Sequence, residues 1–108
     1  MRYRESFFVG MFIMGLLASA ASPVFASTFT TIDLPGATDT LAIGINARGQ
    51  IVGLYVAGGT HGFLLDKGNF TTIDVPGAEA TEAFGINARG QIVGVYSAGG
   101  IGHGFVLH

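Results

Sequence analysis

The chain contains no cysteine and no tryptophan, and charged residues make up only 11% of its 108 positions. Without cysteine it can form neither a disulfide framework nor a thiolate metal centre, the two devices on which small secreted domains often rely. Its five Lys and Arg residues are too few for the clustered basic surface that binds nucleic acid. Disulfide scaffolds, cysteine-based metal sites and nucleic-acid partners are therefore excluded.

The first 26 residues differ from the rest and have the parts of a secretory signal peptide. A basic start is followed by an apolar run over 7–21, by Pro23 and by a Val-Phe-Ala triplet ending at Ala26. This order predicts export and removal of residues 1–26 by cleavage after Ala26. The protein is then secreted, extracellular or periplasmic. The alternative is that residues 7–26 remain as a membrane anchor, and membrane contact is expected through this segment alone.

The remaining residues, 27–108, carry three basic against six acidic side chains, a net charge of −3 with His neutral. A cysteine-free chain of this length has a small core. We therefore expect its stability to come from sheet packing, from self-association, or from both.

One phrase is written twice: IGINARGQIVGLY begins at Ile43, and FGINARGQIVGVY begins at Phe84. Aligned over their whole length, the two repeats share 28 identities in 38 paired positions, and Gly102 is the one inserted residue. A period near 40 residues is typical of repeat architectures. The chain after the leader is therefore divided into two tandem β repeats, 29–69 and 70–108.

Four short strands are predicted in each repeat, and no segment reads as a helix. The strand-like runs of the first repeat are FTTID, LAIGI, QIVGLYV and HGFLL, rich in β-branched and aromatic residues. Pro-Gly pairs and Asn-Ala-Arg-Gly segments separate them, and the latter predict hairpin turns with glycine in the left-handed region. The predicted turn residues are Pro35, Gly36, Asn46 and Gly49, and their equivalents Pro76, Gly77, Asn87 and Gly90.

The third strand of the repeat carries apolar side chains on both faces. Because side chains alternate along a strand, Ile51 and Tyr55 lie on one face, and Val52, Leu54 and Val56 lie on the other. Such a strand needs a cover on both sides, as in a β-propeller, where each blade lies between two others. We predict an all-β fold of two four-stranded, propeller-blade-like units. The alternative is a compact eight-stranded sandwich or barrel.

Three phrases that occur in both repeats resemble a known family. They are GINARGQIVG at 44–53 and 85–94, FTTID followed by Pro-Gly-Ala, and the His-Gly-Phe triplets at 61–63 and 103–105. Through them the chain is similar to the HAF family of extracellular repeats in bacterial exported proteins. The family's own triplet is His-Ala-Phe, so Gly62 and Gly104 depart from it. The resemblance implies a surface or secreted β-repeat protein whose activity is undefined, and whose relatives usually carry more repeats.

Two repeats are too few to close a ring, because propellers have roughly four to eight blades. Three outcomes follow from this shortfall. Several chains associate into a homo-oligomer that completes the ring, or the two repeats fold on each other as a sandwich or barrel. In the third outcome the chain is a truncated fragment of a longer repeat protein.

Four residues are the weak binding candidates: His61, His103, Arg48 and Arg89. Two histidines could ligate a metal, but zinc requires three or four ligands and no further set has suitable spacing. The histidines are better explained as strand residues bonded to backbone or to a carboxylate. The arginines lie at turn tips, where an anionic surface glycan is the one ligand class they would suit. No metal and no cofactor is predicted.

The acidic residues give only weak enzyme readings. Asp33 and Asp74 are equivalent positions, each better explained as a turn acceptor than as a catalytic carboxylate. An active site needs different groups in different roles, whereas repeated residues serve what every repeat needs. We expect a non-catalytic exported protein with a structural, self-assembly or binding role. The alternative is a carbohydrate-binding or carbohydrate-cleaving propeller-like protein, with its ligand near Asp39, Glu79 and Glu82.

Overall fold

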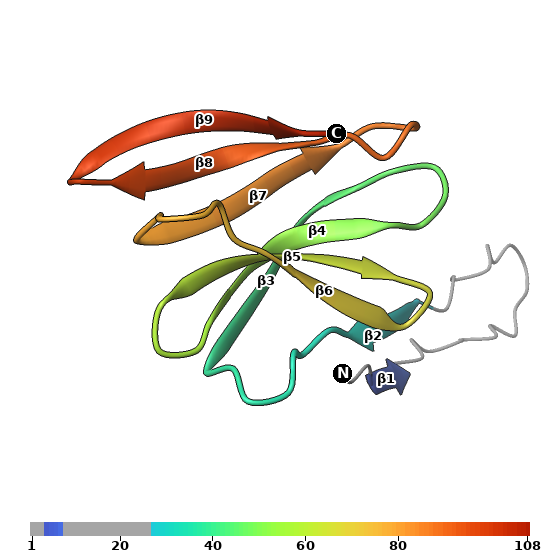
Figure 1. Cartoon of the computed structure of the whole chain (residues 1–108). Helices are drawn as coiled ribbons and strands as arrows, with labels where there is room; N and C mark the ends of the chain where they lie inside the picture. The colour runs from blue at the N-terminus through green and yellow to red at the C-terminus, as the bar shows by residue number, and fades with distance from the viewer. Residues whose placement is uncertain (1–3, 8–26) are drawn as a thin grey trace, which may run out of the picture.

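The computed structural model describes residues 4–7 and 27–108 and shows an all-β protein (Figure 1). The described residues form nine strands and no helix, and eight of the nine lie in the two repeats. The predicted fold class and strand number are thereby confirmed. Apart from residues 4–7, the predicted signal peptide lies outside the described residues. The strands are β1 (Arg4–Phe7), β2 (Thr28–Thr31), β3 (Asp39–Ile45), β4 (Ile51–Val56), β5 (Thr60–Asp66), β6 (Asn69–Ile73), β7 (Ala80–Ile86), β8 (Ile92–Ala98) and β9 (Ile101–Leu107).

Strands β3 to β9 form one curled sheet with two halves. The first half is the antiparallel array β3-β4-β5-β6, and the second half is β7-β8-β9. A single parallel pairing, Thr60 with Ala80, joins β5 to β7. Strand β7 then packs over β3, β4 and β5, so the second half lies above the first in Figure 1.

The sheet halves do not coincide with the sequence repeats. A two-residue turn, Lys67-Gly68, joins β5 directly to β6, and both turn residues have positive φ (54° and 82°) as a tight hairpin demands. Strand β6 contains the FTTI that opens the second repeat, so the first half takes its fourth strand from the second repeat. The FTTI of the first repeat spans Phe29–Ile32, and β2, which includes its first three residues, pairs with β1 instead.

The first strands of the two halves, β3 and β7, which we call the inner strands, each contain a bulge. The bulges lie at Ile43 and Phe84, where the register with the next strand shifts. Close to the first bulge the two halves approach each other at Gly44. A Cβ there would lie 2.8 Å from the Phe84 carbonyl oxygen, so only glycine fits without a backbone shift. Gly53, within β4, is instead crowded by its own neighbour β3, since a Cβ would lie 1.9 Å from the Leu41 oxygen.

Each half has two apolar faces, which we name after one residue each. The valine face of the first half contains Val52, Leu64 and Ile73, and that of the second half contains Val93, Val95 and Val106. The tyrosine face of the first half contains Ile51, Tyr55, Phe63 and Leu65, and that of the second half contains Ile92, Tyr96, Phe105 and Leu107.

The core consists of two clusters, and each covers one face of the first half. In one cluster Val52 and Ile73 of its valine face pack on Ala83 and Ile92, on the tyrosine face of the second half. In the other cluster the tyrosine face, with Phe63 at its centre, is covered by Ile32, Leu34 and Ala37 from the segment before β3. The expected cover on both sides is therefore confirmed for β4.

Candidate self-association surface

The Asn-Ala-Arg-Gly segments form matching turns at the ends of β3 and β7. The Asn46 Oδ1 atom accepts from the backbone N–H groups of Arg48 and Gln50, both at 3.0 Å, and Gly49 has φ +80°. Asn87 does the same for Arg89 and Gln91, and Gly90 has φ +83°. Asn46 also joins the two halves, because its Nδ2 donates to the Asn87 carbonyl oxygen at 2.9 Å.

The Pro-Gly pairs form the turns that lead into β3 and β7. Ala37 donates to the Leu34 oxygen across Pro35-Gly36, and Ala78 donates to the Val75 oxygen across Pro76-Gly77. Both glycines have positive φ, 89° and 82°, as the third residue of a type II turn requires. These residues shape the backbone and present no side-chain chemistry.

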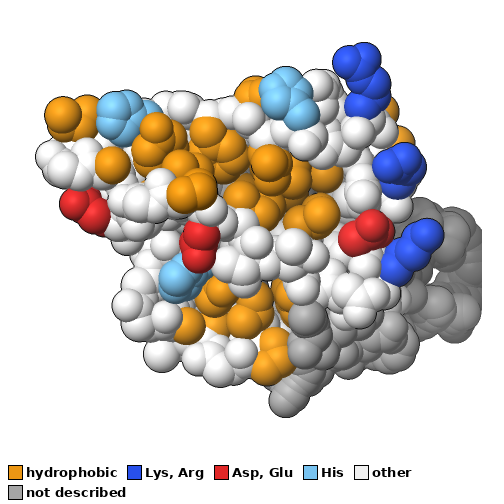
Figure 2. Space-filling model, viewed as in Figure 1, with side chains coloured by type: hydrophobic (Ala, Val, Ile, Leu, Met, Phe, Trp, Pro, Cys, Tyr) orange, Lys and Arg blue, Asp and Glu red, His pale blue; other side chains and the backbone are white. Residues whose placement is uncertain are grey.

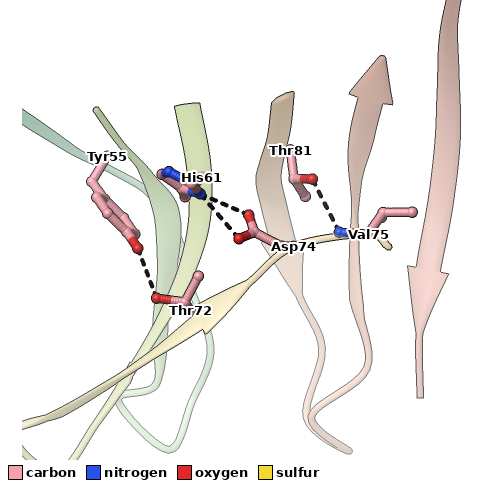
Figure 3. Close-up of polar contacts among 6 residues, drawn as sticks. All are labelled: Tyr55, His61, Thr72, Asp74, Val75 and Thr81. Atoms are coloured by element: carbon pink, nitrogen blue, oxygen red, sulfur yellow. Dashed lines mark hydrogen bonds and ion pairs between the residues drawn. The ribbon is translucent and has the colours of Figure 1, made fainter. Parts of the chain in front are cut away.

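His61 is held by a carboxylate and an aromatic ring. Its Nδ1 lies 3.0 Å from both Asp74 oxygens, and its ring stacks on Tyr55 with centroids 5.0 Å apart. The Tyr55 hydroxyl in turn lies 2.7 Å from the Thr72 hydroxyl. Figure 3 shows that Tyr55 joins β4 to β6, and that His61 joins β5 to the turn after β6. The pair is partly exposed, so it adds little stability and mainly fixes the position of β6.

His103 repeats only part of this arrangement. Its ring stacks on Tyr96 with centroids 5.0 Å apart, as His61 stacks on Tyr55. Among the described residues no carboxylate bonds to it, because the strand that would bring an equivalent of Asp74 is missing beside β9. The two histidines lie on different strands, and the described residues contain no cluster of three or more side chains able to hold a metal.

The remaining polar candidates are dispersed. Glu79 accepts from the backbone of Gly99 at 3.1 Å and caps the turn between β8 and β9. Asp39 accepts from the Thr38 hydroxyl at 3.3 Å. Glu82 lies instead in a shallow hollow on the valine face of the second half, with Val95 and Ser97. The three acids therefore have three different surroundings.

Arg48 and Arg89 lie exposed at the turn tips. Arg48 and Lys67 line a shallow depression beside the Ile51 end of β4, and Asp66, which accepts from Gln50 at 3.2 Å, lies at the same end. The structure thus leaves both arginines at the surface, and it does not bring them together with His61 or His103 into one site.

The two halves differ most in the exposure of equivalent residues. Val52 is fully buried, but its equivalent Val93 is 46% exposed. Leu65 is 3% exposed, but its equivalent Leu107 is 43% exposed. The side chains are the same in each pair, so the difference comes from what covers them. In the second half the valine face and the free edge of the tyrosine face have no cover among the described residues.

Strand β9 forms the open edge of this surface. It pairs with β8 alone among the described strands, whereas its equivalent β5 lies between β4 and β6. A groove of about 630 Å³ runs beside it, lined by Leu64 and Ile73 on one side and by Phe105 and Leu107 on the other. Figure 2 shows hydrophobic side chains gathered in a band across this side of the molecule.

Sequence reasoning did not identify this surface, because near-identical repeats give no reason for one to be covered and the other open. The usable signal was the Lys-Gly pair between HGFLLD and NFTTI, which assigns FTTI to the preceding strands.

Comparison with known proteins finds no matching family model, curated protein or solved structure. Within residues 4–7 and 27–108, no helix has the length and apolar character needed to span a membrane.

Proposed function

We propose that the protein is a non-catalytic, exported β-repeat protein whose role is to assemble with copies of itself. The observation that carries the proposal is the contrast between equivalent residues, buried in the first half and exposed in the second. A large exposed apolar face beside an open strand edge usually marks an interaction site. Within the chain, the valine face of the first half is already covered by a tyrosine face, and a second copy carries another tyrosine face, so it is a partner of suitable shape.

The arrangement of the halves supports a propeller-like assembly of HAF-type repeats. The valine face of one half packs on the tyrosine face of the next, and the inner strands approach at Gly44. Adjacent propeller blades stack in this way around an axis. Two halves form part of such a ring, and further copies would supply the rest.

The polar side chains of the turns and strand ends support a non-enzymatic role. Asn46, Asn87 and Glu79 satisfy turn backbone, and Asp74 is engaged with His61. Each of these groups has a structural partner in the subunit, and they do not converge on one point as an active site requires.

Native mass spectrometry of the secreted protein tests the proposal. The expected spectrum contains homo-oligomers, and a closed ring of roughly four to eight blades would correspond to two to four chains. The same measurement reports whether residues 1–26 have been removed. A well-folded monomer that persists at high protein concentration would refute self-assembly.

A surface glycan is the second candidate ligand, favoured by one observation. A shallow hollow on the valine face of the second half contains the Glu82 carboxylate and the Ser97 hydroxyl beside the apolar side chain of Val95. The hydroxyl groups of a sugar can hydrogen-bond to such polar groups. A glycan array probed with the wild type and with Glu82→Ala tests this idea, and the absence of any binding that depends on Glu82 would reject it.

A further inference from the structure

We propose that β2 of one copy adds to the outer edge of β9 in another copy and supplies the fourth strand that the described residues do not provide there. This inference rests on the proposed self-assembly and specifies its joint. The partner is a second copy of this chain, and the contact is head to tail, from the start of one repeat array to the end of another.

The chain itself contains the pattern for this joint. Strands β5 and β9 share the HGF triplet, and β2 and β6 both contain Phe-Thr-Thr. Within the chain β5 pairs with β6 in an antiparallel register that sets Phe63 opposite Thr72 and Leu64 opposite Thr71. Because the sequences are equivalent, the same register is open to β9 and to the β2 strand of another copy.

Transferring that register gives specific pairs between copies. Val106 stands opposite Thr30 of the second copy, as Leu64 stands opposite Thr71. Leu107 then stands opposite Phe29, as Leu65 stands opposite Phe70.

The faces on either side of the joint also match. In the chain, the valine face of the first half receives the tyrosine face of the second half. Adding β2 to β9 brings the exposed valine face of the second half against the tyrosine face of the next copy's first half. That receiving face already carries Ile32, the equivalent of Ile73 at the existing contact, together with Leu34 and Ala37. The new interface therefore repeats one that the protein already forms.

Glu82 on the valine face is compatible with this contact. Its equivalent in the first half is Leu41, which stays 47% exposed even though the second half covers that face. A carboxylate at this position accordingly remains in contact with water and avoids the cost of burial.

The polar contacts of the joint complete the partial arrangement at His103. Asp74 follows β6 and reaches His61, and Asp33 is the residue that follows FTTI in the first repeat. In the joint, Asp33 of the second copy reaches His103. Thr31 likewise meets the Tyr96 hydroxyl, as Thr72 meets that of Tyr55. The aromatic contact of Phe63 with Phe70, at 5.4 Å, has its counterpart between Phe105 and Phe29.

The present partner of β2 indicates how the joint is controlled. In the full chain β2 pairs with β1, which lies within the predicted leader. Removal of residues 1–26 removes β1, so the backbone groups of β2 that pair with β1 become available to another strand. Since a head-to-tail contact uses two different surfaces, it forms rings where the rotation closes and filaments where it does not.

Cysteine crosslinking tests the joint, because the chain has no thiol of its own. One full-length preparation carries Thr30→Cys and another carries Val106→Cys, both exported through the native leader, and the two are mixed and mildly oxidised. A third preparation carries Gly102→Cys, on the same face of β9 but four residues away, in open space. A double variant, Leu64→Cys with Thr71→Cys, reports the yield for a pair already opposite each other within the chain.

The expected result is a disulfide-linked dimer from the Thr30 and Val106 preparations, at least tenfold more abundant than from the Thr30 and Gly102 preparations. Its yield should approach that of the intrachain control. Oligomers that form without this preference overturn the strand joint and leave self-assembly standing. The absence of both oligomers and crosslinks, with the intrachain control positive, overturns the two proposals together.

Discussion

Val52 and Val93 offer a matched pair of substitutions, because they occupy the same position in two identical Ile-Val-Gly segments. Replacing either by Ala removes the same two methyl groups and changes strand propensity equally. The surroundings differ: Val52 is fully buried between the halves, and Val93 is 46% exposed on the valine face. Any difference between the two variants in the free energy of unfolding therefore comes from how far the surrounding side chains bury the valine, and not from the substitution itself.

The expected difference follows from transfer energies. Burial of two methyl groups contributes about 1.6 kcal/mol, and the cavity left at Val52 raises the cost of V52A to about 2–3 kcal/mol. At Val93 about half of the transfer term applies and no closed cavity forms, so V93A should cost about 0.8 kcal/mol. With a urea m-value of about 1 kcal/mol/M, the two unfolding midpoints should differ by roughly 1.2–2.2 M.

Urea unfolding followed by circular dichroism measures this difference in dilute solution, where the chains are separate. As the concentration rises and copies assemble, the valine face becomes covered and the cost of V93A should approach that of V52A. Equal costs for the two variants in the monomer would refute the assignment of an open valine face. A cost of V93A that stays constant in assembled protein would show that assembly does not use this face.

Three further predictions concern the subunit and its leader. Gly53→Ala places a Cβ 1.9 Å from the Leu41 oxygen and should lower the free energy of unfolding by more than about 3 kcal/mol. Gly102→Ala, in open space, should change it by no more than about 0.5 kcal/mol. Thermal melts compare the two variants, and a mild effect of Gly53→Ala would contradict the crowding. Asn46→Ala should lower the free energy of unfolding in urea by about 1 kcal/mol more than Asn87→Ala, because the Asn46 side chain also donates to the Asn87 carbonyl oxygen in the other half. Equal losses of stability would count against that bond. Protein that lacks residues 1–26, and therefore β1, should assemble at a concentration at least tenfold lower than protein in which a blocked cleavage site retains the leader. Sedimentation measures the two assembly concentrations. Equal values would exclude a role for the β1–β2 pairing.

The strand content and the turns could be predicted from the sequence because they depend on local chemistry. Glycine at positions 49 and 90 marks a left-handed turn, and the apolar residues on both faces of 51–56 predict a strand with two covers. Such signals need no knowledge of distant segments. The structure places them as expected in the first half.

The sheet membership of FTTI and the difference between the halves could not be read in the same way. The sequence similarity divides the repeats before FTTI, whereas hydrogen bonding divides the sheet halves after it, because the tight turn at Lys67-Gly68 joins β6 to β5. Val93 and Val52 have identical neighbours in sequence, so only the tertiary arrangement makes one exposed. For the same reason the sequence predicts a backbone or carboxylate partner for His61, but it does not identify Asp74, which follows a strand assigned to the other repeat.

The offset between repeat and sheet has a consequence for chains of any length built on this plan. Each added repeat would contribute one FTTI strand to the sheet half before it and would need one FTTI strand from the repeat after it. A longer array would therefore still have one FTTI strand without a sheet half at its start and one incomplete sheet half at its end. A donor strand would always remain at the first repeat and a vacant edge at the last. Both are satisfied only when the donor strand pairs with the vacant edge, either of the same chain or of another. The number of repeats then decides the size of the ring or the length of the filament subunit, while the joint itself stays the same.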